Sequence, residues 1–242
     1  MILFAVLLIS FFATLVRSSL GFGEALVAVP LLLFFLPAEV AVPLAVMLSV
    51  VIALVIVIQD HKKIHFDSAK WLILYALLGL PLGIYILTNA DEGIMKIMLA
   101  LLILLYSLYS LFSKKQQTLK KDSKWGLFLC GFLSGILGGA YGLNGPPLVI
   151  YGNLRRWTPT HFRATLQAYF LPVSLLSVIG FYYKGLVTTQ LNTYFLYSLL
   201  STIPAIFIGR YINRKLKDAL FFQFVYYGLI VISIILLATT LV

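Results

Sequence analysis

The sequence is poor in charged residues. Only 11% of its 242 residues are charged and 62% are hydrophobic, whereas roughly a quarter of a soluble domain is charged. The mean hydropathy of +1.03 excludes a water-soluble fold, because too few polar side chains remain to cover a core. Apolar runs of roughly 20 residues recur along the chain, and each is long enough to cross about 30 Å of hydrocarbon. We therefore expect an integral membrane protein.

Cysteine is almost absent. The single cysteine, Cys130, lies in an apolar run, which excludes an intrachain disulfide and predicts a packing role. The first residues, MILFAVLLISFFATLV, lack the basic start and the small-residue cleavage site of a signal peptide, so we expect them to form the first membrane segment. The net charge of +10 is interpreted by its placement around the membrane, and no nucleic-acid partner is expected.

Motifs for catalysis and for cofactors are also missing. The sequence contains no Walker-type phosphate loop and no cysteine-rich metal motif. The segment GFLSG at 131–135 lacks the spacing of a nucleophile elbow, and His161, the only later histidine, falls in a predicted loop. His61 and His65 stand four residues apart, as metal ligands on one helix face often do. No third ligand is evident beyond Asp60 or Asp67, so we interpret the segment as a solvated loop. We expect no enzyme, no cofactor and no metal.

Ten apolar pieces are present, and some are too short to span a bilayer. They cover residues 2–19, 24–36, 39–58, 69–88, 93–112, 125–138, 146–154, 160–183, 190–210 and 219–241. Pieces 24–36 and 146–154 are too short for an untilted span, and 125–138 is marginal. Because the short pieces flank two glycine-rich breaks, we predict two helical hairpins, 2–19 with 24–36 and 125–138 with 146–154.

The distribution of positive charge supports this pairing. Of the 18 lysine and arginine residues, all except Arg17, Lys96 and Lys184 then fall on one side. They lie in the segments 59–70, 113–124, 153–163 and 210–217. Because cytoplasmic loops carry an excess of positive residues, we place these segments in the cytoplasm and both termini outside. A single crossing by residues 125–154 would move two basic loops outside, against this bias.

The two halves then share one order of parts, a broken hairpin followed by three crossings, in opposite orientations. The predicted fold is an all-α polytopic membrane protein of two inverted-topology repeats, 1–112 and 125–242, joined by a basic cytoplasmic linker, 113–124. Locally, GFGEALVAVPLL (21–32) matches GGAYGLNGPPLV (138–149). Inverted repeats of this kind are typical of secondary transporters, whose site lies at the midplane between broken helices.

The breaks themselves predict an anion site. A helix that begins inside the bilayer presents its first N–H groups and the positive end of its dipole, and both favour an anion. Glycines let the backbone approach a ligand, and proline at a helix start loses no hydrogen bond. The candidate substrate residues here are Gly21, Gly23, Glu24, Tyr141, Gly142, Asn144, Gly145 and Pro146. For Tyr141, packing is the alternative role.

Close helix packing is the alternative explanation for glycine in these regions. Gly131, Gly135 and Gly139 follow one another at four-residue spacing, as do Gly79 and Gly83, and small residues at this interval let membrane helices touch. Spacing alone favours packing. Two similar breaks at corresponding positions of the predicted repeats favour a site, because packing does not require them.

Charged and polar residues near the breaks have two interpretations each. Arg17 is a substrate or gate residue, or it snorkels or pairs with Glu24. Glu24 is a capping acid, or a proton carrier that couples transport. Arg163 and Gln167, one turn apart in RATLQ, are candidate anion ligands, with a role as a positive-inside anchor as the alternative for Arg163.

Three stretches, RSSLGFGEALVAVPLL (17–32), GGAYGLNGPPLVIYGNLRRW (138–157) and FRATLQAYFLP (162–172), resemble the sulfite exporter TauE/SafE family of bacterial membrane proteins. The resemblance runs over nearly the whole chain. It implies an exporter of sulfite or of organosulfonates such as sulfoacetate in the bacterial inner membrane, acting through the two motifs. The sequence departs from the family pattern at Glu24, Ala25 and Asn144, where glycines are common.

The predicted function is therefore a secondary transporter of a small anion that works by alternating access. Its expected partners are that anion and the lipid bilayer, and a homodimer remains open. Two alternatives belong to other classes, a passive anion channel and a non-transporting membrane protein that anchors an enzyme through its basic loops.

Overall fold

The chain is helical throughout the part that the structure describes. This computed structural model describes residues 2–61, 64, 66–112, 119, 123–155, 157, 159–215 and 219–241. Within these ranges there is no strand. The helices are α1 (Ile2–Leu20), α2 (Glu24–Leu32), α3 (Ala38–Asp60), α4 (Phe66–Asn89), α5 (Glu92–Phe112), α6 (Lys124–Tyr141), α7 (Gly145–Leu154), α8 (Pro159–Tyr183), α9 (Thr189–Lys215) and α10 (Ala219–Leu241). The predicted all-α fold is confirmed.

Each predicted apolar piece corresponds to one helix. The largest difference is at α9, which continues to Lys215 where 190–210 was predicted, and the next is at α2, which ends at Leu32 where 24–36 was predicted. The next residues form tight turns, in which the Phe35 N–H donates to the Leu32 carbonyl oxygen over 2.9 Å. Pro37 explains this early end, because a proline disfavours helical geometry at the residue before it.

Six helices among the described residues are long and apolar enough to cross a membrane. They are Ile2–Leu20, Ala38–Asp60, Phe66–Asn89, Glu92–Phe112, His161–Tyr183 and Thr189–Asn213. Large apolar side chains such as Phe4, Leu78, Leu105 and Leu200 are exposed on the outside of the bundle. Such a surface is suited to lipid, where outward-facing apolar side chains carry no penalty. The chain is a multi-pass membrane protein.

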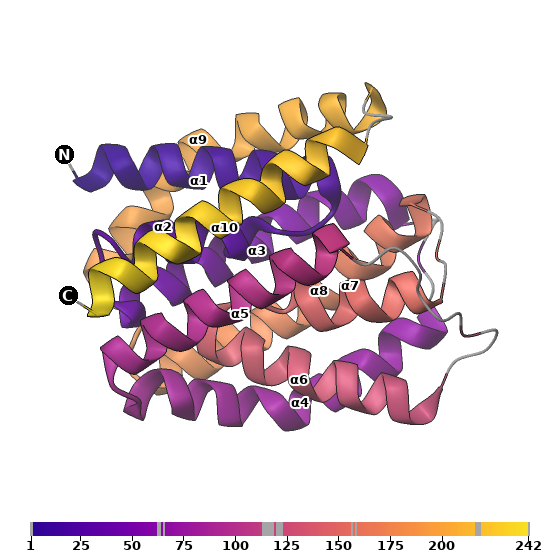
Figure 1. Cartoon of the computed structure of the whole chain (residues 1–242), viewed down its shortest axis with the longest axis horizontal. Helices are drawn as coiled ribbons and strands as arrows, with labels where there is room; N and C mark the ends of the chain where they lie inside the picture. The colour runs from indigo at the N-terminus through magenta and orange to yellow at the C-terminus, as the bar shows by residue number, and fades with distance from the viewer. Residues whose placement is uncertain are drawn as a thin grey trace.

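The helices run mainly along the long axis of the molecule, and both termini lie at one end (Figure 1). Helices α6 and α10 begin at the opposite end, which we call the basic end because the lysine- and arginine-rich segments adjoin it (Figure 1). Several residues of those segments, including Lys62, Lys63, Arg156 and Lys217, lie outside the described residues, as does His65. The sidedness that the predicted hairpins give to the termini and to the basic segments stays a prediction.

The main helix contacts join the two predicted halves. Helix α1 packs on α9, α3 on α8, α4 on α6 and α5 on α10. If each helix is replaced by the helix five places away in the chain, the pair α1 and α9 becomes the pair α6 and α4. The pairs α3 with α8 and α5 with α10 are each converted into themselves. This pairing is the one expected of two intertwined repeats, and their inverted symmetry stays a prediction.

The glycines at four-residue spacing serve the contact between α4 and α6. A Cβ atom at Gly139 would lie 2.6 Å from the Leu80 carbonyl oxygen, and a Cβ at Gly131 would lie 2.8 Å from that of Leu72. At Gly135 a Cβ would overlap the backbone of α4 outright. Packing is therefore the role of these three glycines, since only a missing side chain lets the two backbones approach so closely.

Candidate functional site

A small pocket, with a cavity volume of about 20 Å³, lies where the starts of α2 and α7 meet. Seven of the predicted site residues line it, namely Arg17, Gly23, Glu24, Gly142, Asn144, Gly145 and Pro146. The other lining residues are Phe22, Ala25, Leu26, Ser49, Leu143 and Phe170. Two short helices from distant parts of the chain therefore direct their N-termini at one shared space. The pocket combines a few polar groups with aromatic and aliphatic walls.

The first break, residues 21–23, has a backbone conformation that favours glycine. Gly21 and Gly23 have φ values of 87° and 97°, in the left-handed region that side chains disfavour. The N–H of Gly21 still donates to the Arg17 carbonyl oxygen over 2.6 Å, which closes the last turn of α1. Because Gly23 has no side chain to cap α2, the first N–H groups of that helix are left for the pocket.

The second break, residues 142–144, is built differently. Gly142, with a φ of 69°, caps α6, and its N–H donates to the Gly138 carbonyl oxygen over 2.9 Å. This is a common glycine ending of a helix. Helix α7 then begins at Gly145, one residue earlier than predicted, and its next two residues are prolines. Proline has no N–H, so α7 presents its dipole with fewer donors than α2.

Arg17 is the buried cation of the pocket, with 3% of the residue exposed. Its Nη1 donates to Glu24 Oε2 over 2.5 Å and to Ser49 Oγ over 2.5 Å. Its Nε and Nη2 donate to Gln167 Oε1 over 3.2 and 2.8 Å, and the guanidinium lies 4.8 Å from the centre of the Phe170 ring. A charge at this depth requires such partners. The pair with Glu24, one of the alternatives from the sequence, is formed.

Glu24 is the acid of this pair and is equally buried, at 3% exposure. One carboxylate oxygen, Oε2, accepts from Arg17. The other, Oε1, is buried without a hydrogen-bond partner in the described part of the chain. A buried acceptor without a donor is unfavourable by about 1–3 kcal/mol, so this oxygen is a place for a proton or a ligand hydrogen.

Side chains of α8 connect to the backbone of both breaks by hydrogen bonds, directly at the first break and through Ser134 at the second. Gln167 Nε2 donates to the Gly21 carbonyl oxygen over 2.6 Å. Tyr169 Oη donates to Ser134 Oγ over 2.8 Å, and Ser134 Oγ donates to the Asn144 carbonyl oxygen over 2.6 Å. The buried carbonyl groups of both breaks thereby gain donors, which irregular backbone at membrane depth requires.

Sequence reasoning missed several residues that build the site. They are Ser49, Ser134, Tyr169, Phe170 and Ser174, of which Ser49 Oγ lies 3.2 Å from Ser174 Oγ. A signal was available for part of this set. Gln167 and Ser174 stand seven residues apart in an apolar helix, and polar residues on one face of a membrane helix point to protein or to a cavity.

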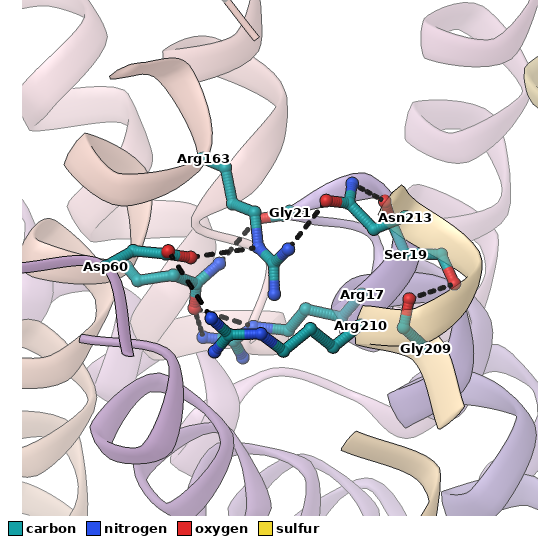
Figure 2. Close-up of polar contacts among 9 residues, drawn as sticks. Arg17, Ser19, Gly21, Asp60, Arg163, Gly209, Arg210 and Asn213 are labelled. Atoms are coloured by element: carbon teal, nitrogen blue, oxygen red, sulfur yellow. Dashed lines mark hydrogen bonds and ion pairs between the residues drawn. The ribbon is translucent and has the colours of Figure 1, made fainter. Parts of the chain in front are cut away.

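Four predicted site residues lie outside the pocket lining. Gly21 and Gln167 adjoin it, since Gln167 contacts both Arg17 and the Gly21 carbonyl oxygen. Tyr141, the last residue of α6, is buried. Arg163 lies on the other side of the first break, where a Cβ at Gly21 would be 3.1 Å from Arg163 Cγ. Arg163 belongs to a separate polar cluster (Figure 2). Within the described ranges no three His, Cys, Asp or Glu residues gather as a metal site.

Comparison with known proteins gives one result. The family model described as "Sulfite exporter TauE/SafE" matches residues 6–237. No curated protein and no solved structure matches the chain. With nearly the whole sequence covered, and with the helices and broken hairpins in place, the chain belongs to the TauE/SafE sulfite exporter family of membrane transporters.

Proposed function

We propose that the protein is a secondary transporter that exports a small anion, sulfite or an organosulfonate, across the bacterial inner membrane, without enzymatic chemistry. The observation that carries this proposal is the pocket at which two half-length helices begin beside the buried Arg17. Membership of the family supports transport of sulfite. The pocket supports alternating access, because a site between broken helices is the usual arrangement in secondary transporters.

The electrostatics of the pocket favour an anion under one condition. Each helix N-terminus contributes roughly half a positive charge, whereas the formal charges of Arg17 and Glu24 cancel at 2.5 Å. When Glu24 takes up a proton, the Arg17 charge is no longer balanced. The pocket then offers a full positive charge and uncapped N–H groups to an anion.

This condition couples the anion to a proton. The proton binds at Glu24 Oε1, the oxygen that has no hydrogen-bond partner among the described residues. The anion then binds to Arg17 and to the start of α2, and both leave on the other side. The ion pair of Arg17 and Glu24 then forms again. Under the positive-inside rule, the basic end faces the cytoplasm and both termini face outward.

Flux measurements in proteoliposomes test this proposal. Purified protein is reconstituted, and the flux of sulfite, a short organosulfonate and a carboxylate is followed with and without a pH gradient. We expect the gradient to drive sulfite or sulfonate flux. Glu24→Gln is expected to keep a flux that no longer responds to pH. The matched control is Glu92→Gln, which removes the acid of the surface ion pair with Lys96 at 2.9 Å and leaves flux unchanged.

The outcomes separate the alternatives. Absence of flux for every anion, with insertion of the protein verified, would end the proposal. A conductive flux that ignores both pH and Glu24→Gln would identify a passive anion channel. Loss of pH dependence in Glu92→Gln as well would show that the effect is not specific to the pocket.

A further inference from the structure

A second polar cluster, largely covered, lies beyond the first break (Figure 2), where α3 ends next to the basic segment 59–70. Asp60, the last residue of α3, stands between two arginines, with Oδ2 3.9 Å from Arg163 Nε and Oδ1 4.0 Å from Arg210 Nη2. Arg163 Nη1 donates to Asn213 Oδ1 over 2.8 Å, and Asn213 Nδ2 donates to the Ser19 carbonyl oxygen over 2.5 Å. We call these five residues the basic-end cluster.

The basic-end cluster ties both predicted halves together. Asp60 and Ser19 belong to α3 and α1, whereas Arg163 belongs to α8, and Arg210 and Asn213 belong to α9. The side chains of Arg163, Asp60 and Arg210 are 8%, 15% and 24% exposed. These charged groups are therefore largely covered by the helices that meet there.

The cluster also touches the candidate site. The side chain of Arg163 packs on Gly21, and the Gly21 carbonyl oxygen accepts from Gln167 over 2.6 Å. Gln167 in turn accepts from Arg17 over 2.8 Å. The first break therefore lies between the basic-end cluster and the pocket, and Figure 2 shows Gly21 next to Arg163 with Arg17 beyond it.

We propose that the basic-end cluster is the gate that closes the pocket toward the basic end. This inference rests on the proposed alternating access, in which contacts between the halves form in one state and are lost in the other. The two ion pairs are suited to this, because charges about 4 Å apart without a short hydrogen bond hold less firmly than close pairs. Movement of the first break, when Arg17 exchanges Glu24 for an anion, reaches Arg163 through Gly21 and Gln167.

A structural anchor for the ends of four helices, α1, α3, α8 and α9, is the competing role. An anchor and a gate differ in what happens to the pocket when the cluster is weakened. Loss of an anchor lowers stability and leaves the pocket as closed as before. Loss of a gate contact raises the population in which the pocket opens to the basic end.

Thiol labelling separates the two roles without any substrate. Ala25, which lines the pocket, is replaced by cysteine in a background where the single cysteine is removed by Cys130→Ala. A membrane-impermeant maleimide is applied from the basic side of vesicles. Asp60→Asn is expected to raise the labelling rate about tenfold, which corresponds to about 1.4 kcal/mol of population shift.

Two further variants keep the test decisive. Arg210→Gln removes the most exposed cation of the cluster and is expected to raise labelling in the same direction if Asp60→Asn does not fold. Asp67→Asn is the matched control, because it removes an acid from an exposed ion pair with Lys70 at 2.8 Å. We expect no change in that variant. Thermal unfolding in detergent verifies that each variant is folded.

Unchanged labelling in folded Asp60→Asn or, where that variant does not fold, in folded Arg210→Gln would overturn the gate. An equal rise in Asp67→Asn would also overturn it, since the effect would then be a general one of surface charge. Increased labelling in a protein that moves no anion would retain the gate and remove the proposed substrate.

Discussion

The two breaks share a pocket but differ in chemistry. The first break places two left-handed glycines before α2 and has Arg17 and Glu24 beside it. The second break uses one left-handed glycine before α7, and its only polar side chain in the pocket is that of Asn144. The first break holds the ionisable groups, whereas the second completes the walls and the dipole. One pocket with a single charge centre results from two similar motifs.

The difference extends to the N–H donors. The first residues of α2 are Glu24, Ala25 and Leu26, each with an N–H group. Helix α7 begins with Gly145, Pro146 and Pro147, so two of its three initial donors are missing. An anion that bound by helix dipole alone would use both ends equally. The unequal donors predict instead that the anion lies closer to α2 and Arg17.

The largest expected effect comes from removing the charge of the first break. Arg17→Gln leaves Glu24 buried without its cation, and loss of one partner of a buried pair costs about 3–5 kcal/mol. We expect a fall in transport of at least about 100-fold together with a lower melting temperature, measured by proteoliposome flux and by thermal unfolding. Arg17→Lys is expected to recover only part of the activity, because lysine lacks the planar fork that reaches Glu24, Ser49 and Gln167 together.

Asn144→Ala is the matched change in the second break. It removes the polar side chain there without leaving a buried charge, so we expect a smaller loss of transport than in Arg17→Gln. If Asn144→Ala abolishes transport while the protein stays folded, the two breaks contribute equally and the asymmetry drawn here is wrong.

The next effect concerns backbone conformation, and it compares the two breaks by replacing one glycine in each, Gly23 and Gly145, with alanine. A Cβ at Gly23 would find its nearest neighbour, Val16 Cγ1, at 3.4 Å, so space is available, but the φ of 97° strains any L residue. At Gly145 the nearest atoms, those of Phe22, would lie at 3.8 Å and no such φ is required. We expect Gly23→Ala to lose about 1–2 kcal/mol of stability and Gly145→Ala to lose less, because only the milder restriction on a residue before proline applies there. Denaturant titration in detergent measures both, and equal losses would contradict this assignment.

The sequence was sufficient for the helices and for the breaks. Long apolar runs fix the spans because hydrocarbon demands them, and glycine and proline mark where a helix stops. Spacing could not decide which glycines form contacts between helices. Gly135 and Gly139 pack on α4, whereas Gly142 lines the pocket, and the difference depends on which helix lies opposite.

The role of α8 could not be predicted for the same reason. Arg163 and Gln167 stand one turn apart, and both contact Gly21, yet Arg163 reaches the basic-end cluster and Gln167 reaches Arg17. Periodicity places residues on a face and does not say what is packed against it. The ties from Tyr169 and Ser134 to Asn144 likewise depend on helices that are distant in sequence.

A smaller effect is expected from the tie that holds the second break. Ser134→Ala removes the donor to the Asn144 carbonyl oxygen and the acceptor for Tyr169, and a typical hydrogen bond contributes about 1 kcal/mol. We expect a modest loss of stability and a transport rate within a few-fold of the original. Tyr169→Phe, which keeps the bond from Ser134 to Asn144, is the control and should lose less. A complete loss of transport in folded Ser134→Ala would mean that the second break carries more of the chemistry than its composition indicates.

The smallest expected effect is a gain. Pro146→Ala gives the start of α7 an N–H group at a residue that lines the pocket, and one helix-terminal interaction with an anion contributes about 0.3–1 kcal/mol. We expect the apparent affinity for the transported anion to rise by up to about fivefold, measured as the half-saturating concentration for flux, with little change in maximal rate. Pro30→Ala, in the interior of α2 and away from the pocket lining, is the control for proline removal and should leave the affinity unchanged. Because the added donor strengthens the weaker end only, an unchanged affinity in Pro146→Ala would place the anion against α2 and Arg17 alone, whereas a rise well above tenfold would show that α7 is the principal contact and would reverse the comparison.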